Sequence, residues 1–218
     1  MIYSVKTLEL SLKECSMKLK ELISKARGNS KHSCHKTEFG FVDESLANSG
    51  IVVEYHCGNK RKIKLIVNPS MLFGYDGLSE FWNPKNKNVS KLLQKLDDII
   101  ESYFDYEYGL NDFKLCEVCV SANVKLDERE LVHAYISVFN NIGRVKGFKP
   151  KFTKVDNSRN KSIRFDLKGN SNGVEFSAFD LAAMSKLAGI KGMHERVREI
   201  LAFDVRLTTQ SAIRNYAN

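Results

Sequence analysis

Polar and apolar residues alternate in three segments of the C-terminal half, which are the two strands of a predicted pair at 162–180 and a third strand at 201–207. A period of two is typical of a β-strand with one face in the core and the other outside it. The apolar face of this predicted sheet consists of Ile163, Phe165, Leu167, Val174, Phe176, Leu201, Phe203, Val205 and Leu207. The polar face consists of Arg164, Asp166, Glu175, Ser177, Asp204 and Arg206.

Carboxylates on one sheet surface could hold a divalent cation that stabilises charge on a phosphodiester. We therefore predict Glu175, Asp204 and Asp166 as metal ligands, with Mg²⁺ or Mn²⁺ as the cation. The alternative is a solvated sheet face on which arginine and carboxylate side chains form cross-strand ion pairs. The alternation alone favours this second interpretation.

Basic residues concentrate in the segment that leads into this sheet. Segment 144–168 holds nine basic and two acidic residues, and so contributes +7 of the net charge of +8. Such a segment favours a nucleic-acid backbone as its partner, and an interleaved phenylalanine could stack on bases. A solvated lysine-rich loop is the alternative. The predicted nucleic-acid-binding residues are Arg144, Lys146, Phe148, Lys149, Lys151, Lys154, Arg159, Lys161, Arg164 and Lys168.

The composition is that of a globular protein. The chain has 218 residues, 43% of them hydrophobic, which is enough for one generous domain or two small ones. It contains no apolar run long enough to span a bilayer and no signal-peptide pattern, so we expect a cytoplasmic protein without a membrane partner. Five cysteines without framework spacing indicate reduced thiols. The motifs of phosphate-binding loops, serine hydrolases and zincins do not occur.

The expected elements follow one order twice: a strand, a helix, a group of strands and a helix. The first two thirds predict strands at 2–8, 39–42, 51–57, 62–67 and 114–124, and a helix at 89–104. An acidic capping box at 127–130 predicts the start of a helix that ends at Gly143. A strand near Phe152, a hairpin at 162–180 with an Asn172-Gly173 turn, a short helix, a strand at 201–207 and a terminal helix follow. The predicted fold is α+β, with two antiparallel sheet halves, 1–110 and 111–218, whose helices pack on one face.

Several segments together resemble rolling-circle replication initiators of the plasmid and filamentous-phage type. The resemblance spans roughly residues 62–216 and rests on 67–70, 110–115, 141–148, 169–180 and 200–208. It implies a duplicated antiparallel-sheet fold that recognises origin DNA. It also implies nicking by a tyrosine beside a carboxylate-bound Mg²⁺ or Mn²⁺.

The family motifs are altered at three places in this chain. Glu117 and Cys119 stand where the resemblance implies Arg-x-Asp, Phe179-Asp-Leu181 replaces an aromatic-x-Lys, and Ala202-Phe-Asp204 replaces Arg-x-Glu. Tyr216 is the candidate nucleophile that remains.

Two functions stay open on this basis. One is a DNA-binding, replication-initiator-like protein with metal-dependent nicking. The other is a catalytically degenerate regulator or inhibitor, encoded by a phage or another mobile element, that binds nucleic acid or a ribonucleoprotein. DNA is favoured over RNA as partner, and a protein partner and a homodimer are further candidates.

Overall fold

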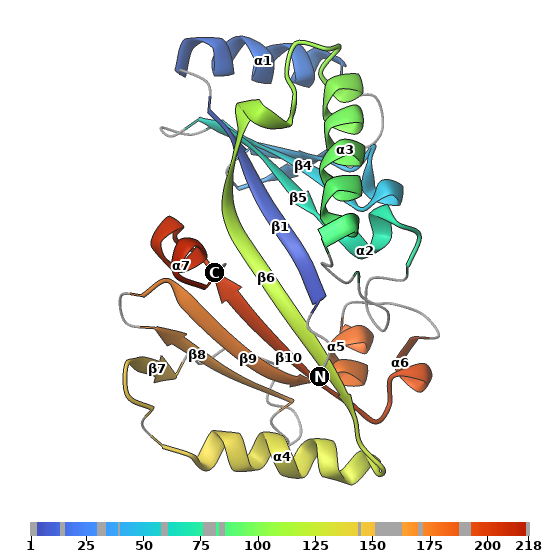
Figure 1. Cartoon of the computed structure of the whole chain (residues 1–218), viewed down its shortest axis with the longest axis vertical. Helices are drawn as coiled ribbons and strands as arrows, with labels where there is room; N and C mark the ends of the chain where they lie inside the picture. Colours follow the sequence, from blue (N-terminus) through green and yellow to red (C-terminus); the bar gives the residue numbers. More distant parts are fainter. Residues whose placement is uncertain are drawn as a thin grey trace. The chain divides into compact units, whose positions relative to one another are not determined.

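The computed structural model places two compact units, one of Ser4–Val118 and one that contains Cys119–Asn218 (Figure 1). Each unit combines helices with strands, and the strand pairs whose register is determined are antiparallel, which confirms the predicted α+β class. The structure describes residues 4–13, 16–29, 34–38, 40–57, 61–75, 82, 86–143, 145–150, 163–169, 172–187 and 193–216.

The N-terminal unit is a sheet with strand order β2-β3-β4-β5-β1. Side chains of β4 and β5 alternate between buried and half-buried, and the buried set packs against α1 and α3 in one apolar cluster. The helix predicted at 89–104 is confirmed as α3. The elements of this unit are β1 (Ser4–Leu12), α1 (Ser16–Asn29), β2 (Cys34–Thr37), β3 (Gly40–Asp43), β4 (Ile51–His56), β5 (Lys62–Val67), α2 (Pro69–Leu72) and α3 (Asn86–Tyr103), with 3₁₀ turns at Ala47–Ser49 and Leu110–Asp112.

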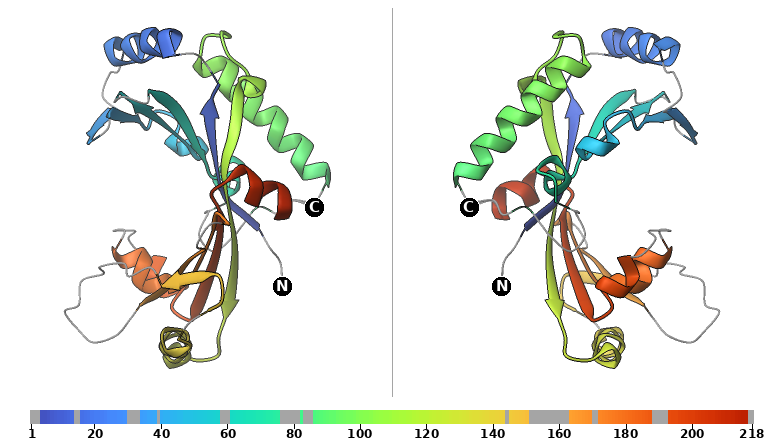
Figure 2. Two further views of the ribbon diagram at one scale, coloured as in Figure 1. Left: turned by 90° about the vertical axis from the view of Figure 1, so that its left-hand side faces the viewer. Right: turned by 90° about the vertical axis from the view of Figure 1, so that its right-hand side faces the viewer.

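The C-terminal unit has the strand order β7-β8-β9-β10-β6, and β6 is the strand that leads into it from the N-terminal unit. Helices α5 and α6 lie side by side in Figure 2. The elements are β6 (Phe113–Lys125), α4 (Arg129–Asn141), β7 (Phe148–Pro150), β8 (Arg164–Gly169), β9 (Val174–Asp180), α5 (Leu181–Leu187), α6 (Met193–Arg196), β10 (Ile200–Leu207) and α7 (Gln210–Tyr216).

Both units follow the same path: a first strand, a helix, and then a meander whose fourth strand lies beside the first. An equivalent hydrogen bond also occurs within each unit. Gly50 before β4 and Gly173 before β9 both have positive φ, at 75° and 66°, and each carbonyl accepts a 2.7 Å hydrogen bond from the residue that follows β5 or β10. The units differ in the connection between their last two strands. In the N-terminal unit β4 is followed directly by β5, whereas in the C-terminal unit α5 and α6 lie between β9 and β10.

The predicted apolar face of the C-terminal sheet is confirmed. The Phe139 ring of α4 lies 5.9 Å from the ring of Phe165 and 6.0 Å from that of Phe203, and Phe176 contacts both strand rings. Helix α5 contacts the sheet through Phe179 and Ala202, which alternate with the residues that face α4. Helix α5 therefore covers one end of the opposite face.

The capping box predicted for α4 is wrong by one residue. Helix α4 has Glu128 as its N-cap, and the Glu128 side chain makes no capping hydrogen bond. Leu131 therefore occupies the third helical position, where the box requires Glu or Gln. The strand predicted near Phe152 is β7 at 148–150. Phe152 itself lies outside the described residues.

Candidate nucleic-acid interface

Three exposed basic residues form a row across four strands of the C-terminal sheet. Lys149 of β7 is opposite Lys168 of β8, and Glu175 of β9 is opposite both Lys168 and Arg206 of β10. Residues directly opposite each other on neighbouring strands share a face. This is the face away from α4, because the neighbouring Phe176 points into the α4 cluster. We call Lys149, Lys168 and Arg206 the basic row.

Glu175 is the one acidic member at this register. Its carboxylate lies 3.8 Å from the ammonium of Lys168, whose side chain is 64% exposed, whereas the side chain of Glu175 is 18% exposed. An ion pair this open to water contributes little to stability. The ammonium of Lys168 is therefore available to a competing anion such as a phosphate.

A second row of polar residues lies one step along the strands from the basic row. Asp166, Ser177 and Asp204 are opposite one another on β8, β9 and β10. The hydroxyl of Ser177 donates to Asp166 at 2.5 Å, and the hydroxyl of Ser121 on β6 donates to Asp204. Asp166 and Ser177 are 6% and 8% exposed, so this part of the predicted polar face is buried rather than solvated. We call these four residues the polar row.

Arg164 is held within the protein by the polar row. Its Nε donates to both carboxylate oxygens of Asp166, at 2.8 and 2.7 Å, and a terminal nitrogen donates to Ser177 at 3.1 Å. The guanidinium also lies 5.7 Å from the centre of the Phe179 ring. Charge-assisted hydrogen bonds of this kind offset the cost of burying the Asp166 carboxylate. Arg164 was predicted as a nucleic-acid contact, and here it stabilises Asp166.

Two of the three predicted metal ligands belong to the polar row, and the third lies at the register of the basic row. Glu175 lies beside Lys168 in the basic row, while Asp166 and Asp204 lie on either side of Ser177. Among the described residues, no three or more His, Cys, Asp or Glu side chains come together as a metal site. Binding of Mg²⁺ or Mn²⁺ stays a prediction.

Several predicted contacts lie near the edge strand β7. Lys146 is exposed, and Phe148 is half-buried against the cluster of Val174, Leu207 and Ala212. Phe148 thus anchors β7 to the sheet. Five predicted contacts lie outside the described residues: Arg144, Lys151, Lys154, Arg159 and Lys161. The backbone of Tyr216 ends α7, but its side chain also lies outside the described part of the chain.

A buried charge cluster that sequence reasoning missed lies on the α4 side of the same sheet. Asp180 is fully buried, and Arg129 of α4 donates to both of its carboxylate oxygens. The backbone N–H of Ala183 donates to Asp180 at 3.0 Å, and His133 Nε2 lies 3.8 Å from it. The signal available in the sequence was a carboxylate directly before a helix, where Asp is a favoured N-cap. This cluster ties α4, β9 and α5 together.

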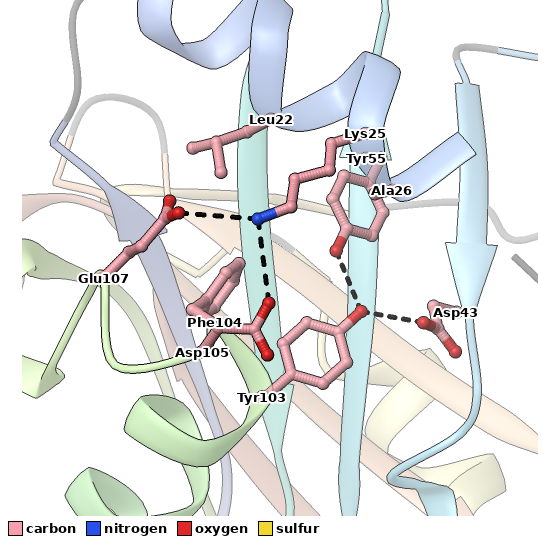
Figure 3. A pocket seen from close by; sticks show the side chains of 9 residues that line it. All are labelled: Leu22, Lys25, Ala26, Asp43, Tyr55, Tyr103, Phe104, Asp105 and Glu107. Atoms are coloured by element: carbon pink, nitrogen blue, oxygen red, sulfur yellow. Dashed lines mark hydrogen bonds and ion pairs between the residues drawn. The ribbon is translucent and has the colours of Figure 1, made fainter. Parts of the chain in front are cut away.

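The N-terminal unit contains a small pocket of about 180 Å³ that no sequence pattern indicated (Figure 3). On one side Tyr103 donates to Asp43 at 2.7 Å and lies 2.8 Å from the hydroxyl of Tyr55. Since a phenol has one proton, Tyr55 must donate to Tyr103. Burial, reinforced by Tyr55 and Asp43, raises the pKa of Tyr103 above its usual range.

On the other side of the pocket, Lys25 of α1 lies 3.4 Å from Glu107 and 3.6 Å from Asp105 (Figure 3). Asp105 and Tyr106 have φ of 52° and 61°, which is uncommon for residues other than glycine. The turn after α3 is thus held in a strained conformation, and Lys25 fixes α1 to it. The pocket joins α1, β3, β4 and α3.

Comparison with known proteins finds a distant likeness in fold. No protein-family model and no curated protein matches the chain. Among solved structures, a rolling circle replication initiator protein from Geobacillus stearothermophilus aligns with 97% of this chain and 76% of its own length, at 10% identity and a TM-score of 0.42. Within the part of the chain that the structure describes, no helix is both long and apolar enough to cross a membrane.

Proposed function

We propose that the C-terminal unit binds nucleic acid, with DNA as the favoured partner, through the sheet face that carries the basic row. The observation that supports this most is the register, which aligns Lys149, Lys168 and Arg206 on one face. Three steps between strands, each about 4.8 Å, give this row a length on the order of 14 Å. Basic side chains spread over such a length can contact several phosphates of one strand.

Two further features support the same face. The sequence between β7 and β8, the strands that carry Lys149 and Lys168, contains four more basic residues: Lys151, Lys154, Arg159 and Lys161. The negative charge of Asp166 on the polar face is also already compensated, because Asp166 accepts hydrogen bonds from Arg164 and Ser177. The unit therefore offers basic side chains at the surface while its buried carboxylate is neutralised inside.

The test is binding of a labelled single-stranded DNA, its duplex and the matching RNA, measured by fluorescence anisotropy at several salt concentrations. The variant Lys149→Glu, Lys168→Glu, Arg206→Glu should bind all three more weakly. For the duplex, the plot of log affinity against log salt should become shallower. Its slope should lose about 2.7 in magnitude, since each of the three phosphate contacts contributes about 0.9.

A matched control places the same three charge reversals in the N-terminal unit, at the exposed residues Lys20, Lys91 and Lys114. We expect this control to bind nearly as the natural chain does. An unchanged slope in the basic-row variant, or an equal loss in the control, would contradict the proposal.

Metal-dependent nicking is a second candidate activity, because the carboxylates of the polar row lie one step from the basic row. In this alternative Asp204, Asp166 and Glu175 hold Mg²⁺ or Mn²⁺ and Tyr216 attacks the phosphodiester. We expect binding with little nicking of supercoiled DNA in Mn²⁺, because Arg164 and Ser177 already engage Asp166. Robust nicking that is lost in Asp204→Asn and Tyr216→Phe would instead support the initiator-like activity.

A further inference from the structure

Helix α4 carries a second, exposed apolar stripe, about a third of a turn from the one that packs on its own sheet. Val132 and Ile136 of α4 are fully buried against the strands. Four other apolar residues of the helix and its C-cap are exposed, by 37%, 46%, 58% and 52%. In chain order they are Leu131, Tyr135, Val138 and Ile142. Single exposed apolar residues are ordinary, but a continuous line of them marks an interaction surface.

The spacing of the stripe is that of helix pairing. Successive members are four, three and four residues apart, which is the a/d spacing of two helices that pack side by side. A helix of 13 residues is about 20 Å long, so the stripe extends along the whole of α4. The partner that fits is another helix with the same spacing.

The charges at the two ends of α4 indicate which helix and in which direction. Asp127 and Glu128 are exposed at the N-terminal end, and Lys146 is exposed just beyond the C-terminal end. In an antiparallel pair of two identical helices, the acidic end of each copy lies beside the basic end of the other. A twofold axis makes this contact complementary to itself and closes it at two copies.

We propose that two copies of this chain associate through antiparallel pairing of their α4 stripes. A contact built on one helix per copy is smaller than the roughly 1,200–2,000 Å² of stable interfaces. Association is therefore concentration-dependent. It uses the α4 side of the C-terminal sheet, whereas the basic row lies on the other face of the sheet.

Sedimentation velocity of the full chain without nucleic acid tests the proposal, from low micromolar to several hundred micromolar protein. The natural chain should shift from monomer to dimer, and the variant Tyr135→Glu, Val138→Glu should stay monomeric over the whole range. Ser137→Glu is the control, because Ser137 is exposed on α4 and lies about a third of a turn from the stripe. Circular dichroism melting checks that each variant is folded.

A charge exchange tests the antiparallel direction. Glu128→Lys alone and Lys146→Glu alone should each weaken the dimer, and the double variant should restore it, because each new pair again has opposite signs. A natural chain that stays monomeric throughout, or a Ser137→Glu variant that loses dimer as fully as the stripe variant, overturns the proposal. So does a double variant weaker than both single ones. Since nucleic acid is absent, these results are separate from the proposed binding function.

Discussion

The most deeply buried charged residue among those described is Asp180, which is fully buried and accepts hydrogen bonds from Arg129. Removing one partner of a buried pair leaves the other charge uncompensated, which costs more than the pair contributes. Its position between Phe179 and Leu181 reads as the end of an apolar strand. Its partner lies 51 residues earlier, so the sequence alone gives no indication of the pair.

We therefore expect Arg129→Met to lower the free energy of unfolding by about 3–5 kcal/mol. The double variant Arg129→Met, Asp180→Leu should recover most of that loss, because no charge is left buried. Urea unfolding followed by circular dichroism gives both values. A single variant within about 0.5 kcal/mol of the natural chain, the range of ordinary surface substitutions, would show that the pair is not essential.

At the scale of elements, the turn before β9 fixes which residues of β8 and β9 stand opposite each other. Gly173 has φ of 66°, and a Cβ there would lie 2.3 Å from the hydroxyl oxygen of Thr209. Gly143 has φ of 76°, but a Cβ there would meet nothing within 4 Å. The two glycines thus share the backbone conformation and differ in the clash.

Gly143→Ala should cost about 1–2 kcal/mol from the left-handed conformation alone. Gly173→Ala should cost clearly more, because Thr209 or the turn must also move. The difference between the two, measured by thermal unfolding, isolates the clash. Equal losses would mean that Thr209 moves aside freely.

Much of the sheet could be predicted from alternation, because β8, β9 and β10 each carry one apolar face. The partners within the polar face could not, because register depends on the turn at Gly173 and on where β7 meets β8. The pairing of Lys149 with Lys168 crosses a long connection that leaves no periodic signal. The burial of Asp166 likewise depends on Ser177 and Arg164 being brought to it by the fold.

At the scale of the whole molecule, two units with one topology carry different chemistry. On the N-terminal sheet, the face away from the helices carries an ion pair between Lys64 and Glu9 on the neighbouring strand, and the His56 ring lies 3.1 Å from the carboxylate of Glu54. On the C-terminal sheet, the three cations of the basic row share their register with one carboxylate, that of Glu175. This difference is why we propose nucleic-acid binding for the second unit and not for the first.

The shared path also sets the order in which each unit can form during synthesis. The first strand lies beside the last: Leu8 pairs with Val67, and Ser121 bonds to Asp204, 83 residues later. Sheets closed by such distant contacts form slowly, on the order of milliseconds to seconds. While a ribosome is still producing β7 to β9, the C-terminal half of β6 has no β10 to pair with. We expect nascent chains to acquire protease resistance in two steps, one after α3 and the start of β6 complete the N-terminal core and one after β10.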